Sequence, residues 1–149
     1  MKTVRRLLQT KDGGIWFTAP ATATSEAMRL MAEKDVGALL VLDEGQLVGI
    51  ITERDLARKI TLAGRDPAST HVREIMSERV LYVRPEHTTD ECMALMIERH
   101  VRHLPVLDGA RIVGMVSIRD VVADLIAEKS FLIEQLENYI YDLPPYSRV

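Results

Sequence analysis

The chain has few aromatic residues, a single cysteine and no excess of basic residues. Phe, Trp and Tyr make up 5% of its 149 residues, so any core must be built mainly from aliphatic side chains. The one cysteine, Cys92, cannot form an internal disulfide, and no Cys/His spacing resembles a zinc site. Nineteen Lys and Arg against 22 Asp and Glu leave a net charge of −3. This balance argues against nucleic acid as the main partner, because neutralising phosphates needs a basic surface.

Long apolar runs and catalytic signatures are also missing. No apolar run approaches the roughly 18 residues that suggest a membrane span, and the N-terminal residues lack the apolar stretch of a signal peptide. We therefore expect a soluble, cytoplasmic protein with no membrane contact. No nucleophile–base pair, metal cluster or glycine-rich phosphate loop is visible, and Cys92 has no evident base beside it. The sequence therefore predicts a protein that is not an enzyme.

The most informative feature is an internal duplication. Residues 20–55 align without a gap onto residues 85–120 at a constant offset of 65, and 16 of the 36 aligned pairs are identical. A unit this short buries its apolar face poorly by itself, so the two copies are expected to pack on each other. Two facing copies would also create two related clefts, where we look for function.

Each copy follows a β-α-β-β-α pattern. In the second copy, the β-branched and aromatic run before Pro85 predicts a first strand, helical spacing of apolar residues predicts a helix, and Asp108-Gly109 marks a turn between two strands. The expected elements are strand Val80–Val83, helix Thr88–His100, strands Leu104–Leu107 and Ile112–Val116, and a helix after Asp120. In the first copy they are strand Ile15–Thr18, helix Thr24–Lys34, strands Ala38–Leu42 and Leu47–Ile51, and a helix from Asp55. The strands Ala38–Leu42 and Leu47–Ile51 read as continuous apolar runs, which predicts burial on both faces.

Short lead-in segments, a linker and a long final helix complete the expected organisation. Residues 3–8 and 71–76 resemble each other, each predicting a short helix before a first strand, and Gly64 and Pro67 indicate a linker between the copies. The final helix keeps an apolar stripe, which includes Tyr139 and Ile140, up to Pro144-Pro145. This stripe suggests packing against a second copy of the chain, and the alternative is that the helix folds back on its own core. The expected parts are 1–62 (first repeat with its lead-in helix), 63–70 (linker), 71–127 (second repeat) and 128–149 (C-terminal helical extension and tail).

The residues best suited to chemistry lie where the third strand of each copy meets the following helix. Thr52-Glu53-Arg54-Asp55 and Ser117-Ile118-Arg119-Asp120 share the form hydroxyl-x-Arg-Asp. A hydroxyl, helix N-terminal N–H groups and an arginine can bind a phosphate, while a carboxylate can accept hydrogen bonds from two ribose hydroxyls. The alternative interpretation is that the hydroxyl and the aspartate are helix N-caps. Capping accounts for the hydroxyl, but not for an Arg-Asp pair kept in both copies.

These motifs resemble a known family. The tandem β-α-β-β-α units, their matching ends at Val48–Asp55 and Val113–Asp120, and Arg102-His103-Leu104-Pro105-Val106 are similar to a pair of cystathionine-β-synthase (CBS) domains, of the stand-alone bacterial two-CBS type. The resemblance covers about residues 3–126. It implies an α/β fold of two tandem CBS repeats packed as a pseudo-two-fold pair, here with an extended C-terminal helix. It also implies a regulatory module that senses an adenine nucleotide.

In that family each cleft takes the hydroxyl-x-x-Asp segment from one repeat and base-contacting strands from the other. The resemblance therefore implies two nucleotide sites. The first would use Thr52, Arg54, Asp55 and Ile50 against His87, Val101 and Arg102. The second would use Ser117, Arg119, Asp120, Met115 and His103 against Thr22, Val36, Gly37 and Ala38. The base would lie between aliphatic side chains, consistent with the lack of aromatics nearby.

The two copies differ within these segments, and several questions stay open. The second copy has Arg102-His103 where the first has Gly37-Ala38, so one strong and one weaker site is as plausible an outcome as two equal ones. AMP is the favoured ligand, with ATP, ADP, NAD(H) and S-adenosylmethionine as alternatives. A homodimer that regulates an enzyme or transporter is expected. The rival interpretation is a ligand-free dimerisation scaffold with degenerate sites. A metal role for His100 and His103 is disfavoured because no acidic or cysteine ligand accompanies them.

Overall fold

The first helix of the chain packs on the second repeat. The structure is a computed structural model that describes residues 2–11 and 14–141. Its contacts divide the chain into two compact units, Asp12–Tyr82 and Met1–Lys11 together with Val83–Val149, called here the first-repeat and second-repeat units. The lead-in of each repeat therefore belongs to the unit of the other repeat. The repeat boundaries drawn from the sequence follow residue identity rather than contacts, and they stay a prediction.

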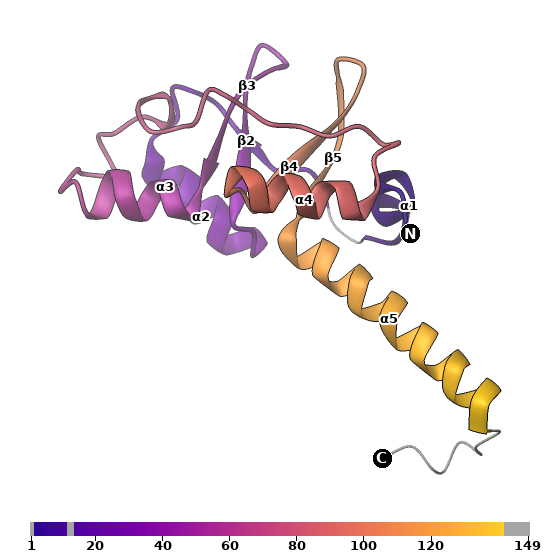
Figure 1. Cartoon of the computed structure of the whole chain (residues 1–149). Coiled ribbons are helices and arrows are strands. Elements are labelled where there is room, and N and C mark those ends of the chain that lie inside the picture. The colour runs from indigo at the N-terminus through magenta and orange to yellow at the C-terminus, as the bar shows by residue number, and fades with distance from the viewer. Residues whose placement is uncertain (1, 12–13, 142–149) are drawn as a thin grey trace. The chain divides into compact units, whose positions relative to one another are not determined.

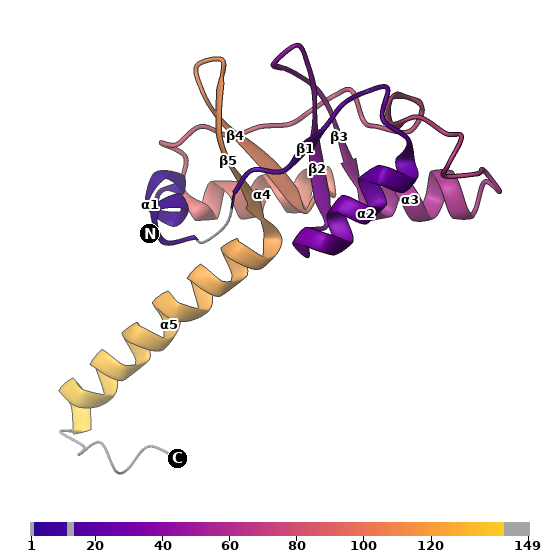
Figure 2. The same ribbon diagram turned by 180° about the vertical axis from the view of Figure 1, so that it is seen from behind.

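The first-repeat unit is a three-stranded sheet with helices. β2 runs antiparallel to β3 (Figure 1). β1, labelled in Figure 2, runs parallel to β2, which gives the order β1-β2-β3. The elements are β1 (Phe17–Thr18), α2 (Thr24–Lys34), β2 (Ala38–Asp43), β3 (Gln46–Thr52), α3 (Glu53–Leu56), a π-helical turn (Ala57–Thr61) and a 3-10 turn (Val72–Glu74). Its core joins α2, the sheet and the two turns through Ala27, Met31, Leu39, Val41, Ile51, Leu56, Ile60, Val72 and Ile75.

The second-repeat unit repeats this pattern with a smaller sheet. β4 and β5 form an antiparallel pair, and α1 and α4 belong to the same unit (Figure 2). The elements are α1 (Val4–Thr10), α4 (Thr89–Arg99), β4 (His103–Asp108), β5 (Arg111–Ser117) and α5 (Ile118–Tyr141). Both hairpins carry an irregularity at matching positions, after Val41 and after Val106. The mixed α/β fold with a long C-terminal helix, as predicted, is therefore present.

The predicted strand Val80–Val83 is wrong, apart from one bridge between Val83 and Val106. The reason lies in the partner strand. In the first repeat Leu40 donates its N–H to the carbonyl of Trp16 at 3.2 Å, which helps to hold β1 beside β2. The matching residue of β4 is Pro105, which has no N–H to donate to Leu81. Within the described part of the second repeat, Val83 therefore keeps one pair of backbone hydrogen bonds, in which it donates to Pro105 and accepts from Leu107.

Burial follows the prediction in β2 but not in β3. Ala38, Leu39, Leu40 and Val41 are all buried, as their continuous apolar run predicted. β3 instead alternates between half-buried and buried positions, and only Gly49 and Ile51 are buried. β5 shows the same alternation. The third strand of each repeat therefore has one face less covered within its own unit.

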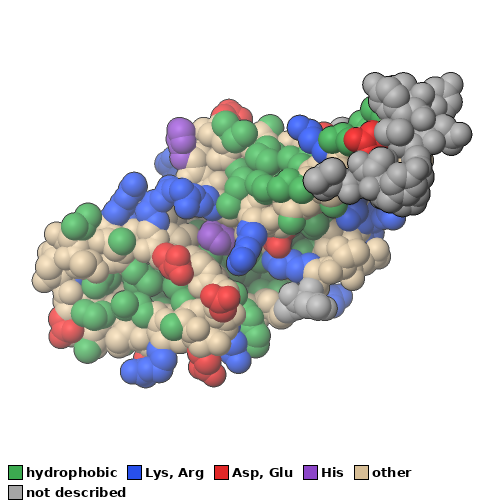
Figure 3. All heavy atoms as spheres, turned by 90° about the horizontal axis from the view of Figure 1, so that it is seen from below, with side chains coloured by type: hydrophobic (Ala, Val, Ile, Leu, Met, Phe, Trp, Pro, Cys, Tyr) green, Lys and Arg blue, Asp and Glu red, His purple; other side chains and the backbone are tan. Residues whose placement is uncertain are grey.

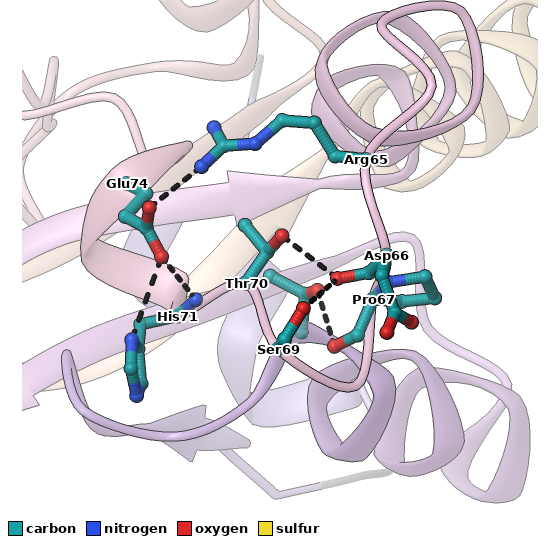
Figure 4. A network of polar contacts seen from close by, with 8 residues as sticks. Arg65, Asp66, Pro67, Ser69, Thr70, His71 and Glu74 are labelled. Carbon is teal, nitrogen blue, oxygen red and sulfur yellow. Dashed lines mark hydrogen bonds and ion pairs between the residues drawn. The ribbon is translucent and has the colours of Figure 1, made fainter.

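The predicted linker caps α2. Its own hydrogen bonds, from the Ser69 and Thr70 hydroxyls to the Asp66 carbonyl, are drawn in Figure 4. α2 has Ala23 at its N-cap, which offers no capping side chain. The carbonyls of Pro67 and Thr70 take its place: Pro67 accepts from the Ser25 N–H at 3.0 Å, and Thr70 accepts from the Thr24 N–H at 2.8 Å. The Thr24 hydroxyl also donates to Pro67 at 2.9 Å. The linker therefore provides acceptors for the N–H groups of Thr24 and Ser25, two of those that a helix start leaves unpaired.

Two matched glycines allow close approach of the lead-in segments. A Cβ added to Gly49 would lie 2.7 Å from Met76 Sδ and 3.0 Å from the Ser77 carbonyl oxygen, which is fixed by its bond from Ile50. A Cβ added to Gly114 would meet only the methyl groups of Leu8, at 2.6 and 2.8 Å. A leucine side chain can rotate away, whereas a paired backbone carbonyl cannot shift without breaking its hydrogen bond.

We therefore expect Gly49→Ala to destabilise the protein more than Gly114→Ala does. Overpacking against fixed atoms costs about 1–3 kcal/mol, and Gly49→Ala should fall in that range. Urea denaturation of the two variants beside the wild type measures the difference. An equal or larger loss for Gly114→Ala would contradict this account of the two contacts.

Candidate functional site

The junction of β3 and α3 is built around Asp55. The Thr52 hydroxyl accepts a hydrogen bond from the Asp55 N–H at 3.2 Å, and Asp55 Oδ2 accepts one from the Thr52 N–H at 2.9 Å. This reciprocal capping box fixes the start of α3. The Asp55 residue is 9% exposed, so its carboxylate is held in one place at a helix N-terminus.

The junction of β5 and α5 repeats this geometry around Asp120. The Ser117 hydroxyl accepts from the Asp120 N–H at 3.2 Å, and Asp120 Oδ2 accepts from the Ser117 N–H at 2.8 Å. The N-cap interpretation of both hydroxyl–aspartate pairs is therefore confirmed. A cap at this place does not compete with a ligand role, because a carboxylate oxygen can accept more than one hydrogen bond.

A lysine contacts each of these carboxylates, and neither lysine was predicted from the sequence. Lys59 Nζ lies 3.0 Å from Asp55 Oδ1 and donates to the Ile75 carbonyl at 2.8 Å. Lys11 Nζ lies 2.8 Å from Asp120 Oδ2 and donates to the Met115 carbonyl at 2.7 Å. The spacing of Lys59 four residues after Asp55 on a helix could have indicated the first pair. Lys11 lies 109 residues from its partner in sequence, and no pattern pointed to it.

The loop before each second strand lies beside the junction of its own unit. Ala38 pairs with Thr52 across β2 and β3, and the Gly37 carbonyl accepts from the Glu53 N–H at 3.1 Å. His103 likewise pairs with Ser117 across β4 and β5. The structure thus brings several of the predicted site residues together within each unit.

In the second-repeat unit the same loop carries a basic residue. The Arg102 carbonyl accepts from the Ile118 N–H at 2.8 Å, and the Arg102 residue is exposed. Arg119, which follows directly in α5, is also exposed. Ile50 and Met115 are half-buried on the third strand of their repeats. Arg54 lies in α3, two residues after Thr52, and is exposed.

The remaining predicted residues lie in loops near the first helix of each repeat. The Thr22 carbonyl accepts from the Val72 N–H at 2.8 Å, and half-buried Val36 donates to the Met31 carbonyl at 3.0 Å. His87 Nδ1 accepts from the Arg84 N–H at 2.8 Å. Val101 donates to the Met96 carbonyl at 3.1 Å. The sequence-based assignment combines residues of both units in each site, and it stays a prediction.

The electrostatics of the second-repeat junction favour an ionised aspartate and a neutral histidine. Burial raises the pKa of Asp120, but hydrogen bonds from Lys11 and Ser117 outweigh it and lower the pKa below the usual 3.8. Burial also lowers the pKa of His103, and the positive charges of Lys11 and Arg102 lower it further against the opposing effect of Asp120. The positive charge of Lys11 therefore lowers the pKa of both Asp120 and His103.

Cys92 and the histidines give no sign of catalytic or metal chemistry within the described ranges 2–11 and 14–141. Cys92 is buried, and burial together with Glu91 raises the pKa of its thiol to about 11. This is the opposite of an activated nucleophile. No group of three or more His, Cys, Asp or Glu side chains in these ranges could hold a metal ion. Within the same ranges, no helix has both the length and the apolar character that crossing a membrane requires.

Comparison with known proteins identifies the family. The CBS domain model matches residues 16–62 and again residues 72–127. The chain belongs to the CBS-domain family. The CBS domain-containing protein CBSX3, mitochondrial, of Arabidopsis thaliana is 40% identical over 135 residues, which cover 87% of this chain and 65% of that protein. The chain thus spans about two thirds of the length of that CBS relative.

Solved CBS structures show the same fold. A protein with CBS domains from Burkholderia ambifaria MC40-6 has a TM-score of 0.83 and 47% identity, over 85% of this chain and 95% of that chain. The CBS domain pair of protein MJ0100 has a TM-score of 0.71 and 26% identity, over 86% and 98%. That domain pair was solved in complex with 5′-methylthioadenosine and S-adenosyl-L-methionine. A CBS pair of related sequence therefore binds adenosine-containing ligands.

The lowered pKa of Asp120 predicts how its contribution to stability depends on pH. A carboxyl whose pKa is depressed by folding stabilises the protein above its unfolded pKa, and this contribution is lost as the pH falls through the folded value. Asp120→Asn should therefore destabilise the protein at pH 7. The difference from the wild type should shrink as the pH falls below 3.8.

Urea unfolding of wild type and Asp120→Asn between pH 7 and pH 3 tests this expectation. Asp108→Asn is the control, because Asp108 is exposed at the end of β4 in the same unit and should change stability little. A stability difference for Asp120→Asn that stays constant over the whole range would show that the carboxylate charge is not what Lys11 and Ser117 stabilise.

Proposed function

We propose that the chain is a regulatory module that binds an adenosine-containing nucleotide at its two strand-to-helix junctions. The observation that carries this proposal is the duplicated, immobilised carboxylate, Asp55 and Asp120, each beside a capping hydroxyl at a helix N-terminus. A ribose offers two adjacent hydroxyl donors to such a carboxylate. The adenosine ligands of the related MJ0100 domain pair support the same ligand class.

Phosphate recognition would come from the arginines next to these carboxylates. Arg54 and Arg119 precede the two aspartates by one residue, and both are exposed. Guanidinium groups bind phosphate oxygens through charge-assisted, often bidentate bonds. AMP is accordingly the favoured ligand, ahead of ATP, NAD(H) and S-adenosylmethionine. The half-buried aliphatic residues Ile50 and Met115 would contact the base.

The regulatory step is a shift between conformations of the module. A ligand can shift such an equilibrium only by as much as its affinities for the two conformations differ. Because α5 begins at Ile118, two residues before Asp120, ligand contacts at this junction act directly on the start of the longest helix. An enzyme or transporter whose activity follows the position of α5 is the class of partner that we propose.

Thermal unfolding against a panel of AMP, ATP, NADH and S-adenosylmethionine tests the proposed function. A ligand at 100 times its Kd should stabilise the protein by about 2.7 kcal/mol, which at this chain length raises Tm by roughly 5–11 °C. Asp55→Ala or Asp120→Ala should remove the increase that comes from its own site. Asp43→Ala and Asp108→Ala are matched controls, since this aspartate pair is also duplicated but is exposed at the hairpin ends. An unchanged Tm with every ligand at saturation would favour the scaffold interpretation.

α5 carries the apolar surface expected of a dimer contact. Its first turns pack within the unit, where Val121 is fully buried, while the rest of the helix runs away from the sheet (Figures 1 and 2). Apolar side chains lie at the surface among charged ones on the face drawn in Figure 3. On α5 the exposed apolar residues are Val122, Ile126, Phe131, Leu132, Ile133 and Leu136. The predicted stripe residues Tyr139 and Ile140, and the stop at Pro144-Pro145, lie outside the side chains that the structure describes.

We therefore expect the protein to be a homodimer that depends on the later turns of α5. Truncation after Glu128 removes four of the six exposed apolar side chains, Phe131 to Leu136. Light scattering coupled to size exclusion should give the mass of a dimer for the full chain and of a monomer for the truncated one. An unchanged oligomeric state after truncation would show that these side chains do not form the contact.

A further inference from the structure

The ammonium group of Lys11 contacts two protein groups that bind the ligand under the proposed function. Its Nζ lies 2.8 Å from Asp120 Oδ2, the proposed ribose acceptor, and 2.7 Å from the carbonyl of Met115, a proposed base contact. An ammonium group has three N–H donors, and these two contacts use two of them. The Lys11 side chain is 31% exposed, so it reaches the edge of the junction.

In the first repeat, the matching third-strand carbonyl and carboxylate have different hydrogen-bond partners. There the strand residue that matches Met115 is Ile50, and its carbonyl accepts a backbone hydrogen bond from the Ser77 N–H at 2.9 Å. The lysine of that junction, Lys59, comes from its own helix and binds the other carboxylate oxygen and the Ile75 carbonyl. Position 124, which matches Lys59, is an aspartate. A lysine on the third-strand carbonyl is therefore a property of the second-repeat unit alone among the described residues.

The surroundings of Lys11 increase the positive character of this junction. Arg102 and His103 stand where the first repeat has Gly37 and Ala38. Burial lowers the pKa of His103, and the positive charges of Lys11 and Arg102 lower it further. Asp120 contacts Lys11 there, so the charge of this carboxylate is already paired.

We propose that Lys11 makes the second-repeat site selective for adenosine ligands that carry negative charge, such as AMP, over uncharged or cationic ones. This inference rests on the proposed function and specifies its ligand class. A ribose hydroxyl can donate to Asp120 while the third N–H of Lys11 stays available to an acceptor on the ligand. A nucleotide phosphate next to this ammonium gains a charge interaction that adenosine lacks, and the sulfonium of S-adenosylmethionine is repelled.

The test compares AMP with adenosine, which share base and ribose and differ in charge. Isothermal titration of the full chain carrying Asp55→Ala reports on the second-repeat site. In this background Lys11→Gln should weaken AMP binding about tenfold and change adenosine binding less than twofold, because it removes the charge and keeps a donor. Lys11→Arg, which keeps the charge, should restore most of the preference for AMP.

Lys2→Gln is the matched control. Lys2 lies on the same N-terminal segment, and its Nζ contacts Asp124 of α5 at 3.1 Å, so the variant removes one charge and one tie to α5 away from Asp120. It should leave the ratio of AMP to adenosine affinity unchanged. A purely structural role for Lys11 predicts instead that Lys11→Gln lowers Tm and weakens both ligands equally, and that result would overturn the inference while leaving the proposed function intact. Failure of the Asp55→Ala chain to bind AMP or adenosine would overturn the inference, and failure of the wild type to bind any ligand of the panel would overturn the proposed function as well.

Discussion

The reciprocal hydrogen bonding between a strand-end hydroxyl residue and the aspartate three residues later is the interaction on which the structure depends. It ends the third strand, starts the next helix and fixes one carboxylate at each junction. A carboxylate held by a backbone N–H and by a lysine needs no rearrangement before it can accept a donor from a ligand. The residues that build the fold at this point are thus the same ones that make it suitable for recognition.

The duplicated unit has kept its backbone geometry while changing the groups that support it. Hairpin register, hairpin irregularity and the left-handed residue after the first helix, Asp35 or His100, recur at matching positions. The supports differ: linker carbonyls cap α2, whereas the Thr88 side chain caps α4. Lys59 comes from within its repeat and Lys11 from the far end of the chain. Because different lysines contact the two carboxylates, the two proposed sites are expected to differ in selectivity.

Much of the fold could be predicted because the signals are local. The bounds of α2 match the prediction from Thr24 to Lys34, and the hairpin strands differ from it by one residue at their ends. The failures arose where a distant residue decides the outcome. Pro105 removes the donor that Leu81 would need, and a strand-like sequence stays unpaired. The hydroxyl-x-Arg-Asp motif located both junctions, but Lys11 could not be inferred, because only the packing of α1 in the second-repeat unit brings it to Asp120.

The packing of residues 2–11 in the second-repeat unit brings the N-terminal segment to the start of α5, the helix through which regulation is proposed. Lys2 and Lys11 both reach carboxylates in the first two turns of α5, Asp124 and Asp120, so residues 2–11 are tied to α5 at two points. The Asp124 side chain is 3% exposed, whereas that of Asp120 is 20% exposed. A ligand in water can therefore reach the second tie far more readily than the first. A nucleotide bound at Asp120 as proposed would compete with Lys11 or share the carboxylate with it, and in either case it would change how firmly the N-terminal segment holds α5. By linkage, a partner that moves α5 by loosening or tightening this contact would change the affinity for that nucleotide by the same factor. Under the proposed function, the N-terminal segment would thus be a part of the second-repeat site.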